Sequence, residues 1–186
     1  KILKKEIKMI NIKKKNFLEE ELSEKEKSFN FSKFHILPIP LEKTVSYAKG
    51  TSKAPEIIIN ASNQLERNHN SPCDFGIYTH DTVDCSLNFN SIFQNIENLI
   101  FEILKKNKIP VCIGGEHSLT FAVIKGFKKK YNKPNEDFGI IQFDAHADLR
   151  KTYNGDINSH ATVMYKIHNE KIPIFQFGVR AQSDEE

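Results

Sequence analysis

Two aspartates and a histidine alternate directly after an apolar segment of the chain. Asp144, His146 and Asp148 follow residues 138–143, whose sequence Phe-Gly-Ile-Ile-Gln-Phe is typical of a buried strand. If the strand continues through them, the three side chains share one face and converge at its carboxyl end. Two carboxylates and an imidazole aimed at one point need a positive group between them, and a divalent metal ion is the simplest candidate. A strand end with solvated polar residues is the alternative interpretation.

A second histidine follows another apolar segment. His117 lies in the sequence Gly-Gly-Glu-His-Ser at residues 114–118, after the predicted strand 109–113. Gly114 and Gly115 allow a tight backbone turn, which would bring His117 to the top of the sheet. Together with the motif at 144–148, His117 offers imidazole nitrogen and carboxylate oxygen ligands and no thiolate. This set of ligands suits Mn²⁺, and zinc and iron remain possible. A carboxylate in such a set can bridge two ions about 3.5–4 Å apart.

Alternating strands and helices must position these side chains. The predicted strands cover residues 34–41, 75–78, 109–113, 138–143 and 172–179. This alternation predicts an α/β fold, with a mostly parallel sheet between helices. Because ligands bind at the carboxyl ends of parallel strands, His117 and the motif at 144–148 are expected at one edge of the sheet.

Four helices are predicted between the strands. Pro55 suits the first turn of one helix, with Ile57, Ala61 and Leu65 as its expected buried stripe. Ser91 is expected to cap a second helix that runs to about residue 107 and has a clear 3.6-residue apolar period. The remaining two are predicted at residues 119–130 and 159–168, the latter with Ser159 as its cap.

Composition bounds the class of protein. The chain has 186 residues, 39% of them hydrophobic and 27% charged, with a formal net charge of +3 that is too small to indicate nucleic-acid binding. The sequence shows neither the roughly 20 apolar residues of a membrane helix nor a signal peptide. Three scattered cysteines favour reduced thiols and hence the cytoplasm. Residues 1–33, rich in Lys and Glu, are predicted to be a charged N-terminal arm, in helical or loose form.

At these motifs the sequence resembles the ureohydrolases, the family of arginase and agmatinase. Gly-Gly-Glu-His-Ser and Asp-Ala-His-Ala-Asp look like the two metal motifs of that family. The resemblance covers about residues 35–186 and extends to segments outside the metal motifs. Those that look like agmatinase segments are residues 44–47, 50–51, 54–55, 61–62, 159–164 and 176–180. The implied fold is a three-layer αβα arrangement of arginase type, of which residues 34–186 would be the N-terminal two-thirds.

The resemblance implies a binuclear manganese site and a mechanism. His117 and Asp148 would bind one Mn²⁺ ion, His146 the other, and Asp144 would bridge them. A hydroxide held between the ions would attack the guanidinium carbon of the substrate, releasing urea and an amine. His160 would protonate the leaving amine through water. A hydrogen bond from His160 to local backbone is the alternative interpretation of that residue.

The resemblance also bears on the substrate and on partners. The segment at 149–156 lacks the arginase pattern, and Arg150 stands where an Asn is expected, which favours agmatine over arginine. Glu116 stands where many members have Asp and is expected to orient the site without binding metal. Agmatine hydrolysis would produce putrescine for polyamine biosynthesis. The family implies a small-molecule substrate and a homo-oligomer, as a trimer or hexamer.

A third family motif, Ser-x-Asp-x-Asp, is expected beyond Glu186, so the chain carries four of the six expected metal ligands and looks C-terminally truncated. Residues 1–186 alone are therefore expected to be inactive. The alternatives are another ureohydrolase of arginase, guanidinobutyrase or formimidoylglutamase type, a metal-dependent deacetylase or phosphatase on a similar sheet, and a non-catalytic remnant.

Overall fold

Parallel strands form the framework that carries the predicted motifs. The computed structural model describes residues 15–68, 71–131 and 138–186. Its first sheet contains β1 (Phe34–Ile39), β2 (Ile77–Thr79) and β3 (Ile109–Gly114), in the order β2-β1-β3 and all parallel. A second, two-stranded parallel sheet contains β4 (Ile140–Phe143) and β5 (Ile174–Phe177). The predicted parallel α/β class is confirmed, and each strand lies within or next to its predicted segment.

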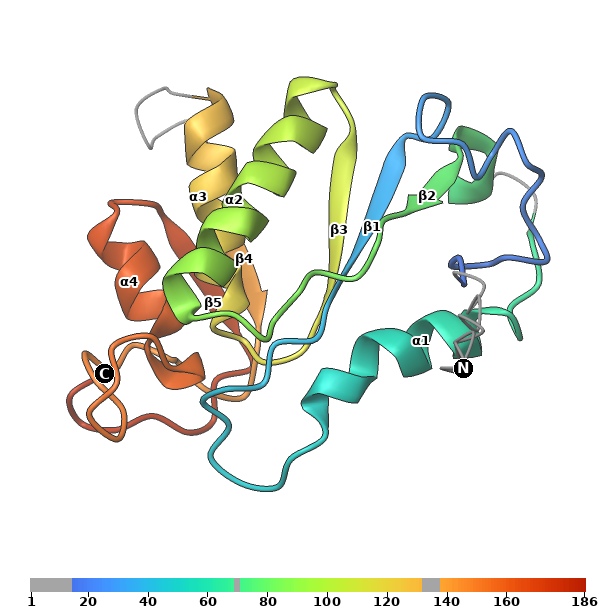
Figure 1. The fold of residues 1–186 in the computed structure, drawn as a ribbon. Helices are drawn as coiled ribbons and strands as arrows, with labels where there is room; N and C mark the ends of the chain where they lie inside the picture. The colour runs from blue at the N-terminus through green and yellow to red at the C-terminus, as the bar shows by residue number, and fades with distance from the viewer. Residues whose placement is uncertain (1–14, 69–70, 132–137) are drawn as a thin grey trace, which may run out of the picture.

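Helices cover both faces of the first sheet. The α-helices are α1 (Ala54–Ser62), α2 (Phe89–Lys105), α3 (Leu119–Tyr131) and α4 (Val163–Asn169). The chain moves from β1 to β2 through α1 and then back across β1 to β3 through α2. Because parallel crossovers are right-handed, opposite directions of travel put α1 and α2 on opposite faces, as Figure 1 shows. This is the expected three-layer arrangement.

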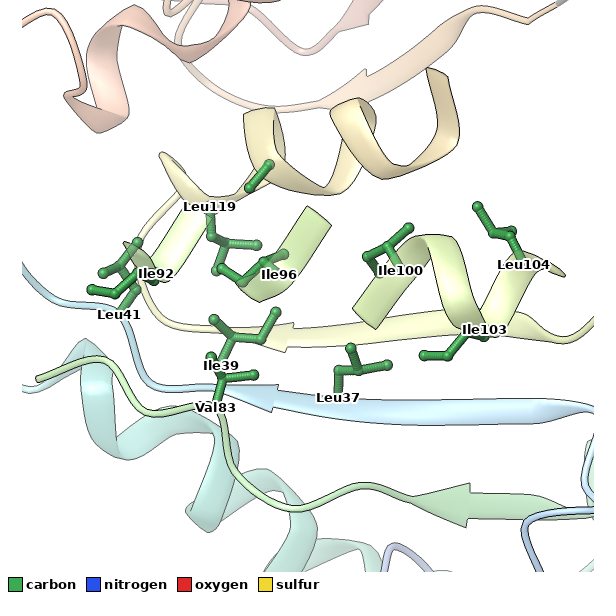
Figure 2. Packing of buried hydrophobic residues seen from close by; sticks show 11 residues of the cluster. Leu37, Ile39, Leu41, Val83, Ile92, Ile96, Ile100, Ile103, Leu104 and Leu119 are labelled. Carbon is green, nitrogen blue, oxygen red and sulfur yellow. The ribbon is translucent and has the colours of Figure 1, made fainter. Parts of the chain in front are cut away.

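The main core lies between β1 and α2. Leu37 and Ile39 of β1 are fully buried against Ile92, Ile96 and Ile100 of α2, which repeat at four-residue intervals along one helix face (Figure 2). The predicted apolar period of this helix is therefore correct. Its cap differs from the prediction, because Asn88 accepts the hydrogen bond from the Ser91 N–H and the helix begins at Phe89.

Replacing Ile96 by alanine should lower the free energy of unfolding by about 2–5 kcal/mol, because a fully buried side chain is lost and a cavity remains. Ile57→Ala is a matched control, since Ile57 is 60% exposed on α1. Chemical denaturation of both variants at the same temperature measures the difference. Equal losses would contradict the placement of Ile96 in the core.

The buried face of α1 differs from the predicted stripe. Ile57 is exposed, and Leu65 lies beyond the end of the helix at Ser62; the buried positions are Pro55, Ile59 and Ser62. The reason is a contact between distant segments: the Leu18 N–H donates to the Ser62 hydroxyl at 2.9 Å. Periodicity within the helix could not reveal that this earlier segment lies against it.

The described part of the N-terminal segment, residues 15–33, is a series of turns. Its Leu18 and Leu22 are buried against Ile36, Cys73 and Ile77. Among the described residues, no helix is both long enough and apolar enough to cross a membrane.

An uncovered apolar surface lies on the second sheet. Ile141 and Phe143 of β4 and Phe175 and Phe177 of β5 are between 54% and 82% exposed, and the Phe143 and Phe177 rings stack with centroids 5.5 Å apart. Within the described residues, β3 pairs only with β1 and β4 only with β5, so each sheet has an unpaired edge. Exposed apolar side chains beside unpaired strand edges favour association with further polypeptide.

Candidate active site

A tight turn after β3 places His117 at the carboxyl end of the first sheet. The backbone of Gly115 passes so close to Leu41 that a Cβ atom on residue 115 would lie 2.2 Å from the Leu41 carbonyl oxygen. The next N–H, from Glu116, donates to the same carbonyl oxygen at 2.8 Å. Only glycine fits this approach, which explains the second glycine of the motif.

The second motif reaches the site through a loop. Convergence of these side chains was argued for the case that the strand continues through Asp148, but β4 ends at Phe143. His146 forms a single parallel bridge with Ala181, and Asp148 adopts a left-handed backbone conformation with φ of 54°. The aspartates therefore converge because the chain turns, and the condition of a continued strand is not met.

One histidine and two aspartates from these turns gather at one point. The His117 Nδ1 atom lies 2.9 Å from Asp148 Oδ2 and 3.6 Å from Asp144 Oδ2. Ligand atoms of the three residues all lie within 4.8 Å of one another. The sequence prediction that His117 meets the later motif therefore agrees with the geometry.

His146 lies beside this cluster. Its Nδ1 atom is 3.5 Å from Asp144 Oδ1, and its side chain is 63% exposed. The two carboxylate oxygens of Asp144 thus face different histidines: Oδ2 faces His117 and Oδ1 faces His146.

The Asp144 carboxyl is held in its ionised form. Partial burial raises its pKa, but the hydrogen bond from the His146 N–H and the electrostatic influence of the nearby His117 ring outweigh this effect and lower the pKa. A set of imidazole nitrogens and carboxylate oxygens, with no thiolate among them, fits Mn²⁺ or a similar divalent ion.

Two glutamines, Gln142 buried and Gln176 half-buried, support the cluster and were not singled out from the sequence. The side-chain amide nitrogen of Gln142, in β4, lies 3.4 Å from Asp148 Oδ2. The Gln176 amide of β5 donates to Gln142 Oε1 at 2.6 Å and to the Ala147 carbonyl at 2.7 Å. The sequence signal that could have revealed them is a glutamine within each of two apolar strands, because side-chain amides in a protein interior need hydrogen-bond partners.

Glu116 binds protein groups on all sides. Its Oε2 accepts from the N–H groups of Lys43 and Thr44 at 2.6 and 2.7 Å. Its Oε1 accepts from the hydroxyls of Thr44 and Ser118 at 2.7 and 2.6 Å. This carboxyl therefore ties the loop after β1 to the His117 turn, in keeping with the orienting role expected for it.

His160 begins a short 3-10 helix, His160–Thr162, which precedes α4. Ser159 caps it as predicted, accepting from the Ala161 N–H at 3.3 Å. The ring contacts side chains rather than backbone: Nδ1 lies 3.3 Å from Thr44 Oγ1, and Nε2 lies 3.0 Å from Ser46 Oγ.

A pocket of about 630 Å³ joins these groups. It is lined by His117, His146, Asp148 and His160, and by residues that include Ser46, Tyr47, Arg150, Tyr153 and Glu186. Arg150 lies over the Tyr153 ring at 5.4 Å, and its Nε is 3.5 Å from Glu186 Oε2. The pocket is large enough for a small molecule and carries three of the four candidate ligands, His117, His146 and Asp148, on its wall.

The fold recurs in solved structures. The agmatine ureohydrolase of Thermoplasma volcanium matches with a TM-score of 0.73 at 24% identity, over 89% of this chain and 56% of that one. The arginase from Medicago truncatula matches with a TM-score of 0.70 at 24% identity, over 83% and 52%. The chain therefore has an arginase-type α/β fold.

The sequence comparison identifies the family. The model of the Arginase family matches residues 32–186, and the chain belongs to that family. It is 34% identical to the N(1)-aminopropylagmatine ureohydrolase of Synechocystis over 182 residues, 92% of this chain and 58% of that protein. It is 36% identical to the agmatinase of Bacillus subtilis over 163 residues, 80% and 52% respectively. The chain thus spans about half the length of the curated relatives that it matches.

Proposed function

We propose that the protein is a metal-dependent ureohydrolase that cleaves agmatine to putrescine and urea. In the reaction, the guanidinium R–NH–C(NH₂)₂⁺ and one water give R–NH₃⁺ and urea, so the C–N bond to the amine breaks and a C–O bond forms. Two kinds of relative support this substrate, since one is named an agmatinase and another acts on an agmatine derivative.

We assign His117, Asp144, His146 and Asp148 as metal ligands, with Mn²⁺ as the ion. When bound, two such ions would supply a nucleophile near neutral pH, because divalent cations lower the pKa of water. The observation that carries the assignment is the position of Asp144, whose two oxygens face His117 at 3.6 Å and His146 at 3.5 Å. A carboxylate between two imidazoles has the arrangement that a bridging ligand needs.

The remaining pocket residues would bind and orient the substrate. A guanidinium placed between His117 and His146 would extend its alkyl chain into the pocket of about 630 Å³, whose wall includes His160 and Tyr153. His160 is a suitable proton donor for the leaving amine, because it lines the pocket and its Nε2 atom lies 3.0 Å from the hydroxyl of Ser46, another lining residue.

We further propose that the protein is a homo-oligomer, acts in the cytoplasm and contributes to polyamine biosynthesis. Residues 1–33 would form an arm that precedes the catalytic domain. Light scattering after size exclusion would measure the mass. A trimer or hexamer is expected, and a monomer under assay conditions would contradict the oligomer.

The substrate test compares guanidino compounds in an extended protein, in which the chain continues past Glu186 with the corresponding C-terminal part of the Synechocystis relative. Urea release is measured with agmatine, aminopropylagmatine, arginine and 4-guanidinobutyrate. Agmatine is expected to give the highest kcat/KM. A preference for arginine or guanidinobutyrate would overturn the substrate, and release from none of the four by a folded protein would overturn the function.

His160→Asn should slow turnover by about 10²–10⁴-fold while metal content stays unchanged, because the side chain donates a proton and binds no ion. Turnover and metal content of the extended protein are the measurements. His168→Asn is a matched control on α4, with a histidine outside the pocket. Loss of metal from His160→Asn, or an unchanged rate, would contradict the proton-donor role.

A further inference from the structure

We propose that Thr44 is a positioning residue that fixes the tautomer of His160, with Nδ1 protonated and Nε2, beside Ser46, as the basic atom. Its catalytic consequence rests on the proposed function, but the tautomer itself does not. The inference follows from the hydrogen bonds around one hydroxyl oxygen.

The proton of the Thr44 hydroxyl is committed to Glu116. Thr44 Oγ1 lies 2.7 Å from Glu116 Oε1, and an ionised carboxylate can only accept. Glu116 is only 5% exposed and receives three further donors, from the N–H groups of Lys43 and Thr44 and the hydroxyl of Ser118. The carboxylate is therefore held in place to receive this hydroxyl.

The two lone pairs of the same oxygen face His160. Its backbone N–H, which can only donate, reaches Thr44 Oγ1 at 3.1 Å. The second contact is from His160 Nδ1 at 3.3 Å. Because a hydroxyl oxygen has one proton and two lone pairs, the Nδ1 contact requires a proton on Nδ1.

The opposite ring nitrogen then has a free lone pair in the neutral ring. His160 Nε2 lies 3.0 Å from Ser46 Oγ, and Ser46 Oγ lies 2.9 Å from the Tyr153 hydroxyl oxygen. Either hydroxyl can be the donor in the contact between Ser46 and Tyr153, so the Ser46 hydroxyl can donate to Nε2. A proton gained at Nε2 from solvent gives an imidazolium that keeps its Nδ1–H on Thr44. The same proton can then pass from Nε2 to the leaving amine, which leaves His160 neutral in its original tautomer.

Ser159 is the competing partner of Nδ1, because its hydroxyl also lies 3.3 Å away and could donate its proton there. Donation from Ser159 would require the opposite tautomer and would leave the second lone pair of Thr44 unused. The two partners therefore predict different protonation states and can be separated by single substitutions.

The tautomer is read from the ¹⁵N chemical shifts of histidine-labelled protein, in the 186-residue chain and in the extended protein. The His160 signals are those missing from His160→Asn. In alkaline buffer we expect the Nδ1–H form in the unmodified chain, in Thr44→Ser and in Ser159→Ala, and a shift toward Nε2–H in Thr44→Val. An Nε2–H form in the unmodified chain, or a Thr44→Val spectrum equal to it, would overturn the proposal.

Kinetics of the extended protein give an independent test. Thr44→Val should lower kcat by about 10–100-fold with little change in KM, the scale expected when a supporting hydrogen bond is lost, and Thr44→Ser should restore most of the rate. A rise in KM alone, or no rescue by serine, would contradict a positioning role. If the extended protein releases no urea, the proposed function fails, while the ¹⁵N result still decides the tautomer.

Discussion

Asp144→Ala should abolish metal binding and activity more completely than any other single ligand substitution. The two oxygens of Asp144 face His117 and His146, so the loss of this one side chain weakens both proposed ion sites. We expect the extended variant to contain almost no Mn²⁺. Urea release should fall by well over 100-fold, beyond the loss typical of a residue that only supports a metal ligand.

Two other variants separate bridging from general damage to the site. His146→Ala removes a ligand from one side only and should keep about one ion per chain. Asp84→Ala is the control, because this exposed aspartate bonds only its neighbour Ser86 among the described residues. Metal analysis and circular dichroism are measured on each variant. Full metal occupancy with near-normal turnover in Asp144→Ala would contradict the bridging role.

The 186-residue chain by itself should release no detectable urea and should unfold at low temperature. Its four proposed ligands would share two dications that repel each other. Phe143, Phe177 and their neighbours on β4 and β5 expose an apolar face, and β3 and β4 each have an unpaired edge among the described residues. A site held this loosely loses rate steeply, since a misplacement of about 1 Å can cost 10²-fold.

Thermal unfolding, binding of an apolar dye and urea release from agmatine should be measured side by side in the 186-residue chain and in the extended protein, both with Mn²⁺. The extended protein should unfold at higher temperature, bind less dye and be active. Cooperative unfolding of the shorter chain together with agmatine hydrolysis would contradict the account of the uncovered surface.

The elements and the main cluster could be predicted because their signals are local. Apolar runs predicted the five strands, and the 3.6-residue apolar period after Ser91 predicted an amphipathic helix, which α2 is. Glycine followed by His117 at one strand end, and aspartates at the next, predicted a shared site because parallel strands end at one edge. The shared site does not require residues 144–148 to continue the strand.

The supporting contacts could not be predicted because they join distant residues. The Leu18 N–H donates to the Ser62 hydroxyl across 44 positions, on the buried face of α1. Thr44 meets His160 across 116 positions, and no local period links the loop after β1 to the 3-10 helix that precedes α4. Such contacts depend on how loops pass one another, which a single sequence does not encode as a repeating pattern.

The most direct test of the central claim is a manganese titration of the extended protein after removal of metal with a chelator. Urea release from agmatine should vanish in the stripped protein and return as Mn²⁺ is added, reaching a plateau at two ions per chain. Urea release that persists without metal, or a plateau unaffected by loss of Asp144, would contradict a metal-dependent ureohydrolase site at these residues.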